Sequence, residues 1–332
     1  MMVRPPFTSM PLVVQTRLEE ESNDALAALA IPVWLKASHV VSYALLVVVN
    51  AGASLGWVGE TNADVSKKWP VPITPAGYAF SIWYTCMTSN HSSLTDKTIV
   101  TNNQLNNTKY KKRGLIFFLQ GVGAIYTFLN VGYNRESHEK EHAVKAACWV
   151  QAVWLSQDLW QIAFSKESFH ISFFLIASAC AFGVYSVVRL HAARDAVGAF
   201  SALTSAGISI PTSINSSWLL AATCVQLLIT LKSDGMSEGK LSTVAVALVV
   251  MAALVAVGAV LVLSDLAWGL TAVWALVAIA LNNKDEQPAV FTACVVAVST
   301  IVVSVAFSAV RRKMQMRSPT GGRQFVQNPI SA

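Results

Sequence analysis

Long apolar stretches, separated by short polar connectors, run along most of the chain. A bilayer core about 30 Å thick is crossed by roughly 20 apolar residues in a helix, and eight stretches meet or approach that length. They lie at 38–58, 114–133, 143–164, 170–190, 209–231, 241–263, 266–282 and 289–310. Backbone polar groups in lipid must be paired within the segment, so each stretch is predicted to be a helix. The pattern therefore predicts an all-α fold, a polytopic membrane helical bundle of about eight transmembrane helices.

The composition supports this prediction and excludes several classes of protein. Hydrophobic residues make up 54% of the chain and charged residues 13%, against about 25% charged residues in soluble domains. A soluble enzyme, a disordered chain and a collagen-like fibre are therefore excluded. The five cysteines have no paired spacing that would indicate a disulfide framework or a zinc site. The net charge of +6 comes from Lys and Arg beside the apolar stretches, so no nucleic-acid partner is expected.

Polar segments at both ends divide the chain into regions. We expect an N-terminal tail at 1–37, five helices within 38–231, three additional helices within 232–310 and a basic tail at 311–332. An even number of spans places both termini on one side. Lys and Arg are concentrated on that side, which predicts that both termini are cytosolic. The turn before the seventh span contains Ser264 and Asp265, which are expected to form its N-cap.

Residues 84–113 differ from the rest of the chain because they are rich in Thr, Asn, Ser and Lys. Before them, Thr74 and Pro75 are the N-cap and first turn of a predicted helix, which stops after Trp83. After them, an apolar stretch resumes at Gly114 without a cap. Two interpretations remain open: a hydrophilic loop between a half-helix and a span, or a retained intron translated in frame. The codons for Trp and Tyr at the left end can hold a GT donor, and those for Arg and Gly at the right end can hold an AG acceptor.

The third span carries the most informative polar side chains. Gln151, Trp154, Asp158 and Gln161 recur at helical spacing and share one face. An acid in mid-membrane is costly and normally faces a cavity or a partner. These residues are therefore candidates either for a structural hydrogen-bond network between helices or for contact with a ligand.

Small and aromatic residues near two other spans also allow two interpretations, close packing of helices or contact with a ligand. In the fifth span Pro211 precedes Asn215 and Trp218, with two serines between them. Small and hydroxylated residues favour close helix packing. Alternatively, aromatic residues of several helices line a pocket for a flat apolar ligand. The aromatic candidates are Tyr78, Phe80, Trp83, Trp154 and Trp218.

One motif suggests metal chemistry. His138, Glu139 and His142 match the H-E-x-x-H pattern, which places two imidazoles on one face of a helix beside a glutamate base. The match lies in a charged connector where these residue types are common, and no third ligand is evident. A membrane metallohydrolase is therefore a remote alternative, and neither a catalytic residue nor a metal site is assigned.

Three segments resemble the TspO/MBR family, the tryptophan-rich sensory proteins. These are PAGYAFSIW at 75–83, WVQAVWLSQDLWQIAF at 149–164 and PTSINSSWLLAATCVQ at 211–226. The first segment is similar to the start of the family's second helix. The second segment is similar to its Trp-rich third helix, and the third segment to its fifth helix. The resemblance implies a five-helix core over roughly 40–231, followed by the three extra helices of a longer branch. It also implies an interhelical pocket for a tetrapyrrole or sterol-like ligand.

The expected function is therefore binding, sensing or carriage of a flat hydrophobic ligand by a multi-pass, non-enzymatic membrane protein. No cofactor is required, and the ligand in view is a porphyrin or haem-like molecule. The expected partners are the lipid bilayer and a hydrophobic small molecule, and a homodimer is left open. A transporter of small polar solutes that uses Asp158 is the main alternative. The candidate ligand-binding residues are Tyr78, Phe80, Trp83, Gln151, Trp154, Asp158, Gln161, Asn215 and Trp218.

Overall fold

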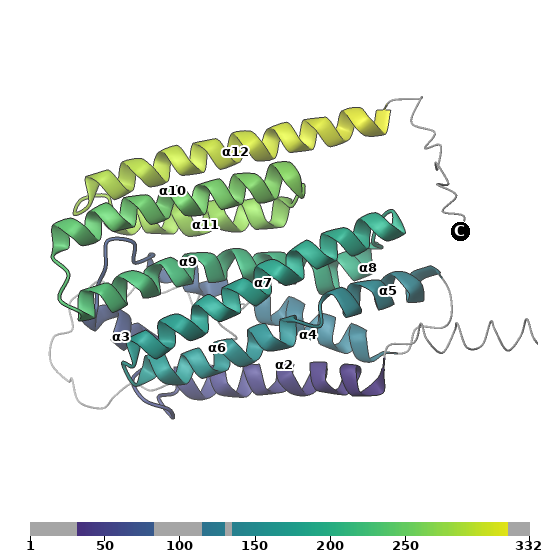
Figure 1. Cartoon of the computed structure of the whole chain (residues 1–332), viewed down its shortest axis with the longest axis horizontal. Helices are drawn as coiled ribbons and strands as arrows, with labels where there is room; N and C mark the ends of the chain where they lie inside the picture. Colours follow the sequence, from purple (N-terminus) through teal and green to yellow (C-terminus); the bar gives the residue numbers. More distant parts are fainter. Residues whose placement is uncertain (1–31, 83–114, 130–134, 318–332) are drawn as a thin grey trace, which may run out of the picture.

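The computed structural model describes residues 32–82, 115–129 and 135–317, and these residues form helices and connecting turns without a strand. Five helices pack side by side in the first part of the bundle (Figure 1). They are α2 (Val33–Ser54), α4 (Leu115–Phe128), α6 (Val150–Ser165), α7 (Phe169–Val197) and α9 (Ile210–Ser233). The predicted all-α membrane bundle is thus confirmed.

Three further helices lie along one side of this group, above α9 and α7 in Figure 1. They are α10 (Glu238–Val262), α11 (Leu266–Asn283) and α12 (Pro288–Arg317). They pack on one another, and α10 and α11 also pack on α9. The helix α2 begins and α12 ends at the same end of the bundle (Figure 1), as an even number of crossings requires.

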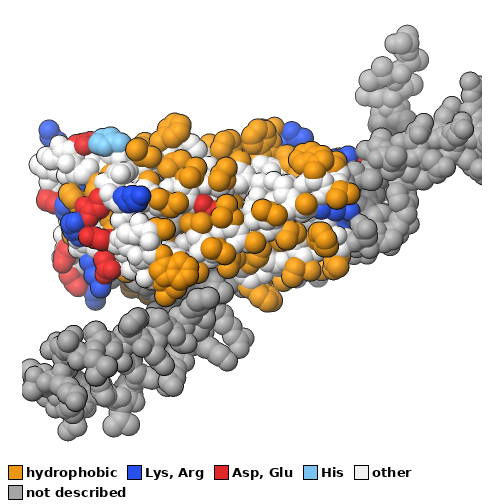
Figure 2. Space-filling view, turned by 90° about the horizontal axis from the view of Figure 1, so that it is seen from below, with side chains coloured by type: hydrophobic (Ala, Val, Ile, Leu, Met, Phe, Trp, Pro, Cys, Tyr) orange, Lys and Arg blue, Asp and Glu red, His pale blue; other side chains and the backbone are white. Residues whose placement is uncertain are grey.

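Six helical segments of the described chain are long and apolar enough to cross a membrane. They are Val33–Ser54, Phe169–Val197, Ala202–Ser233, Glu238–Val262, Leu266–Asn283 and Pro288–Met314. The helices α4 and α6, at 14 and 16 described residues, are shorter than the roughly 20 residues that a full crossing needs. They pack among the longer helices. Apolar side chains cover the length of the molecule and charged ones gather toward its ends (Figure 2).

The third span begins later than predicted. Residues 143–146 belong to a separate charged helix, α5 (Arg135–Ala146), and α6 starts at Val150. The apolar residues Ala143 and Val144 are buried because they form the inner face of α5, so hydropathy alone joins them to the next helix. The fourth span, in contrast, extends to Val197, seven residues beyond its predicted end at 190.

The predicted helix start at Thr74 is wrong. The segment Gly77–Ile82 is a short 3-10 helix, η2, and the Thr74 hydroxyl accepts a hydrogen bond from the Val71 N–H at 3.0 Å. The Thr74 carbonyl accepts hydrogen bonds from side-chain amides at the end of α11, Asn282 and Asn283, both at 3.0 Å. Thr74 is therefore bound to α11 rather than capping a helix of its own.

The tight turn between α10 and α11 joins the two groups of helices. As predicted, Asp265 caps α11, because its carboxylate accepts the Trp268 N–H at 3.0 Å. The other carboxylate oxygen accepts hydrogen bonds from Ser213 of α9 at 2.6 Å and His191 of α7 at 3.0 Å. Asp265 is buried, so this one side chain connects α11 to two helices of the first group.

Candidate functional site

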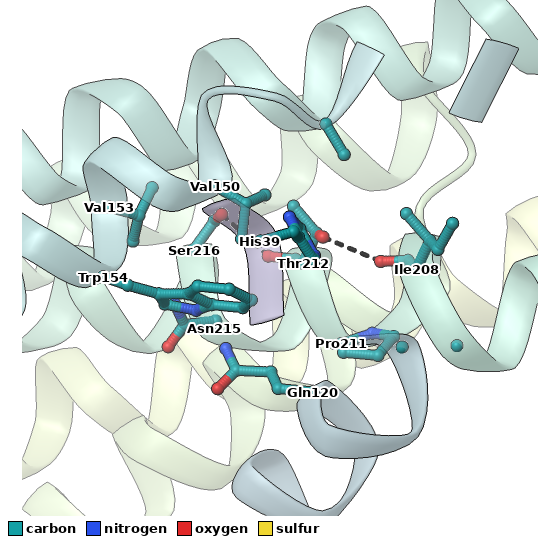
Figure 3. A pocket seen from close by; sticks show the side chains of 13 residues that line it. His39, Gln120, Val150, Val153, Trp154, Ile208, Pro211, Thr212, Asn215 and Ser216 are labelled. Atoms are coloured by element: carbon teal, nitrogen blue, oxygen red, sulfur yellow. Dashed lines mark hydrogen bonds between the residues drawn. The ribbon is translucent and has the colours of Figure 1, made fainter. Parts of the chain in front are cut away.

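A narrow cavity lies between α2, α4, α6 and the beginning of α9 (Figure 3). Its empty volume is about 390 Å³ when the space open to the surroundings is included. The enclosed part has room for only about one water molecule. The cavity is lined by His39, Gln120, Gly123, Ala147, Val150, Val153, Trp154, Gly207, Ile208, Pro211, Thr212, Asn215 and Ser216.

Trp154 of α6 forms the largest wall of this cavity. Its side chain is 1% exposed and packs against two rings of α2. The ring centroids lie 4.8 Å from His39 and 5.7 Å from Tyr43, with tilted planes in both pairs. Burying an indole between aromatic rings contributes about 0.5–1.5 kcal/mol per pair beyond the buried area. The parallel packing of α2 and α6 therefore holds the indole in place.

A π-helical turn, η4 (Ser205–Ser209), forms the opposite wall just before Pro211. Here α4 approaches so closely that a Cβ on Gly123 would lie 1.9 Å from the Gly207 carbonyl oxygen. Only glycine fits at that contact. Such π-helical turns occur frequently at functional sites, and this one places Gly207 and Ile208 on the cavity.

Three polar atoms at the cavity have no hydrogen-bond partner in the part of the chain that the structure describes. They are Gln120 Oε1, Trp154 Nε1 and Asn215 Oδ1, all on buried side chains. The other end of the Asn215 amide donates to Gln157 Oε1 at 3.2 Å, which fixes its orientation. Unpaired buried polar atoms are costly and uncommon. The cavity thus offers one donor and two acceptors beside apolar walls.

A comparison with protein-family models finds the TSPO-like protein family over residues 34–112 and 106–307. The two matched regions together cover more than half of the chain. The chain belongs to the TSPO-like family. Comparisons with curated proteins and with solved structures find no match. The family and the apolar helices together establish a multi-pass integral membrane protein.

The two matched regions meet at residues 106–112, which lie within the polar segment 84–113. That segment and the two interpretations of it lie outside the described residues. The second match continues to residue 307. The matched part of this TSPO-like chain therefore includes α10, α11 and most of α12.

The structure brings together some of the predicted site residues of this TSPO-like chain. Trp154 and Asn215 both line the cavity. Gln151 lies near it, because its side-chain amide is 3.5 Å from His39 Nδ1 and 3.5 Å from the Leu35 carbonyl oxygen. These three residues come from α6 and α9.

Asp158 and Gln161 lie farther along α6, toward the other end of the bundle. Both are buried. The Gln161 amide exchanges hydrogen bonds with Asn62 of α3 (Asn62–Lys68). Neither carboxylate oxygen of Asp158 has a partner among the described residues. The prediction of a polar face on this helix is confirmed, and the face divides between the cavity and α3.

The remaining candidate ligand-binding residues contact α11, or their side chains lie outside the residues that the structure describes. Trp218 packs with Ala79 and two alanines of α11. Tyr78 is half exposed and meets Trp274 edge to face at 5.4 Å. The side chain of Phe80 and the whole of Trp83 lie outside the described residues. Tyr78 and Trp218 therefore do not line the cavity that contains Trp154.

Two residues of the cavity, His39 and Gln120, are not among the site residues predicted from the sequence. Each is a polar side chain within an apolar stretch, and each is buried. A polar residue inside a predicted span is costly and marks a candidate site, so this signal was available. The cavity contribution of Gly207 had no comparable sequence signal, because it depends on the π-helical turn.

The H-E-x-x-H segment lies on α5. Glu139 accepts the Ser201 N–H at 2.9 Å, at the start of α8 (Ala202–Thr204). Glu141 pairs with Lys145 at 2.6 Å. The side chain of His138 lies outside the described residues. Among the residues that were searched, no group of three His, Cys, Asp or Glu side chains could hold a metal ion.

Proposed function

We propose that this TSPO-like membrane protein binds or carries a flat hydrophobic molecule, of the tetrapyrrole or sterol-like class, in the cavity beside Trp154. The observation that carries the proposal is the unpaired polar set, Trp154 Nε1, Asn215 Oδ1 and Gln120 Oε1, on a largely apolar cavity. Small-molecule sites combine apolar and aromatic walls with a few convergent polar groups that orient the ligand. A bound molecule would supply the partners that these atoms lack.

Ligand entry requires the cavity to widen, because its enclosed part holds about one water molecule. The contact that closes it on one side joins two glycines, Gly123 of α4 and Gly207 of η4. No side chains interlock between these two glycines, but nearby Tyr126 of α4 hydrogen-bonds Thr204 of α8 at 3.1 Å and packs in one buried cluster with Ile208 of η4. Widening the cavity on this side therefore has to break that hydrogen bond and separate these side chains.

The test measures the binding of a porphyrin to the purified protein in a neutral detergent. Binding is monitored by the shift in the absorbance of the porphyrin. We expect saturable binding of protoporphyrin IX to the wild type. Trp154→Phe removes the buried N–H donor and is expected to weaken binding about tenfold, which corresponds to about 1.4 kcal/mol.

The matched control is Trp149→Phe. Trp149 lies at the start of the same helix, is 42% exposed, and stacks on Phe182 of α7 at 5.7 Å rather than lining the cavity. Binding to this variant is expected to be unchanged. An absence of saturable binding to the wild type, or equal binding to Trp154→Phe, would refute the proposal.

Transport of a small polar solute is a second candidate, favoured by the two unpaired carboxylate oxygens of Asp158. Buried intramembrane acids often mark substrate or proton pathways. Uptake of labelled solutes into proteoliposomes, lost in Asp158→Asn but kept in Trp154→Phe, would favour transport over ligand binding at the cavity. A hydrolase is not proposed, because the Glu139 carboxylate is engaged by the Ser201 N–H.

A further inference from the structure

A second cavity lies between α9, α10 and α11, at the junction between the first five helices and the last three (Figure 1). Its empty volume is about 420 Å³ when the space open to the surroundings is included. Four alanines on its walls have side chains too short to fill the space where the three helices meet: Ala221, Ala252, Ala272 and Ala275. No described residue lines both this cavity and the one beside Trp154, so the two are separate.

The walls of the second cavity are apolar. The only side-chain oxygen on its lining belongs to Ser217, which donates a hydrogen bond to the Trp268 carbonyl at 3.0 Å. The enclosed part has room for about two water molecules, but a buried water needs two to four polar partners. The second cavity therefore stays dry. The walls beside Trp154, in contrast, carry polar atoms that have no partner among the described residues.

The second cavity lies at the depth of the hydrocarbon core of a bilayer. The helix α10 has 25 residues and is about 37 Å long at a rise of about 1.5 Å per residue. Its lining residues, Leu248, Val249 and Ala252, lie at the middle of this length. The lining residues of α9 lie within 217–224, which is also the middle of that helix. Since the hydrocarbon core is about 30 Å thick, the surroundings at this depth are lipid chains rather than headgroups.

The second cavity has a partly exposed rim and a buried floor. The rim includes Leu248, Ala252 and Ala272, whereas Cys224 and Leu276 of the floor are 5% and 4% exposed. An unfilled apolar space forfeits the dispersion contacts of its walls. The end of one alkyl chain is narrow enough to enter the enclosed part without a movement of the helices, but a fused ring system is not.

We propose that the cavity between α9, α10 and α11 binds the end of one acyl chain of a bilayer phospholipid. The chain enters from the lipid side past the rim, and its end contacts the floor at Cys224 and Leu276. The bound chain fills the junction between the first five helices and the last three and makes dispersion contacts with both groups. This site differs from the proposed ligand site beside Trp154 both in place and in chemistry.

The test is photo-crosslinking of the full chain in phosphatidylcholine nanodiscs. The probe is a phosphatidylcholine with a diazirine at the end of one acyl chain, and mass spectrometry locates the labelled residues. We expect labelling of the floor at Cys224 and Leu276, together with the lipid-facing residues Val250 and Leu254, which are 49% and 68% exposed. A probe with the diazirine beside the ester linkage is expected to leave the floor unlabelled, because the floor lies at mid-membrane depth.

The blocking variant is Ala252→Phe, which places a ring in the opening of the second cavity. Labelling of the floor is expected to be lost, whereas labelling of Val250 and Leu254 persists and verifies that the variant is folded in the nanodisc. Ala272→Leu narrows the same opening from α11 and is expected to reduce labelling of the floor. The matched control is Ala247→Phe, because Ala247 is an exposed alanine of α10 that does not line the second cavity. This variant is expected to keep the wild-type pattern.

Three results would overturn the inference. An unlabelled floor in the wild type would mean that no acyl chain enters. Labelling of the floor that persists in both Ala252→Phe and Ala272→Leu would mean that the probe reaches it by another route. Loss of floor labelling on saturation with protoporphyrin IX would assign the second cavity to a flat ligand instead of an acyl chain.

Discussion

Replacing Asp265 by alanine is expected to detach the last three helices from the first group. The carboxylate accepts three hydrogen bonds, from Trp268 N–H, Ser213 Oγ and His191 Nε2, and is 5% exposed. Removing one partner of a buried charged network costs about 3–5 kcal/mol, of which loss of the helix cap contributes about 1 kcal/mol. At about 2–4 °C per kcal/mol, the Tm should fall by roughly 6–20 °C.

The assay is thermal unfolding in detergent with a thiol-reactive fluorogenic dye, because the protein carries buried cysteines in both groups of helices. Cys294 of α12 and Cys180 of α7 are both buried. In Asp265→Ala, we expect Cys294 to be labelled at a lower temperature than Cys180, since the last three helices separate first. Mass spectrometry of the labelled peptides distinguishes the two sites.

The control is Asp285→Ala, which removes an exposed carboxylate near Lys284 at 3.9 Å. Exposed pairs of this kind contribute about 0–1 kcal/mol, so the Tm should hardly change. A shift below about 2 °C in Asp265→Ala, or simultaneous labelling of both cysteines, would show that Asp265 does not hold the two groups together.

Three further predictions follow from the packing, the polar segment and the surface charges. Gly123→Ala forces a Cβ to within 1.9 Å of the Gly207 carbonyl oxygen, so the melting assay should report a loss of at least about 1–3 kcal/mol. Deleting residues 84–113 should preserve or strengthen porphyrin binding if they are a retained intron, and amplification of the transcript should then yield a shorter product. A hydrogen bond from Lys68 lowers the pKa of Glu167, so this pair stabilises the fold above the ordinary glutamate pKa of about 4.3, and its contribution should disappear as the pH falls through the lowered value.

Each of these three has a control and a contrary result. Gly239→Ala meets no atom within 4 Å and should leave the Tm unchanged; an equal effect of both glycine variants would contradict the close contact of α4 with η4. Failure to find a shorter transcript would favour the hydrophilic loop. For the ion pair, the melting difference between wild type and Lys68→Met should shrink on acidification, and a constant difference from pH 7 to pH 3 would rule out the pair as its cause.

Much of the helical architecture followed from the sequence. The apolar stretches predicted the last three helices to within a few residues, except that α12 continues beyond 310. The N-cap at Asp265 was also predicted correctly, since it depends on a local bond to Trp268. The start of α6 was not, because the inner face of α5 is as apolar as a membrane helix and hydropathy does not separate the two.

The site was only partly predictable. The polar spacing along α6 identified Trp154 and Gln151, and the fifth span identified Asn215. In contrast, the sequence grouped Tyr78 and Trp218 with them, whereas both residues contact α11 or its neighbours. Aromatic residues in different helices can form a common pocket only if the helices turn the same faces together, and that depends on the packing of α9 against α11.

The sequence by itself determined that this protein lives in a bilayer, that it is built of helices, and that it resembles one membrane family. These properties depend on local composition, on the length of apolar stretches and on short motifs. Only the tertiary structure decided which polar residues meet. The cavity of His39, Gln120 and Trp154, and the burial of Lys140, depend on contacts between helices distant in the chain. Such contacts are fixed by how side chains of different helices fit together, which no local pattern records.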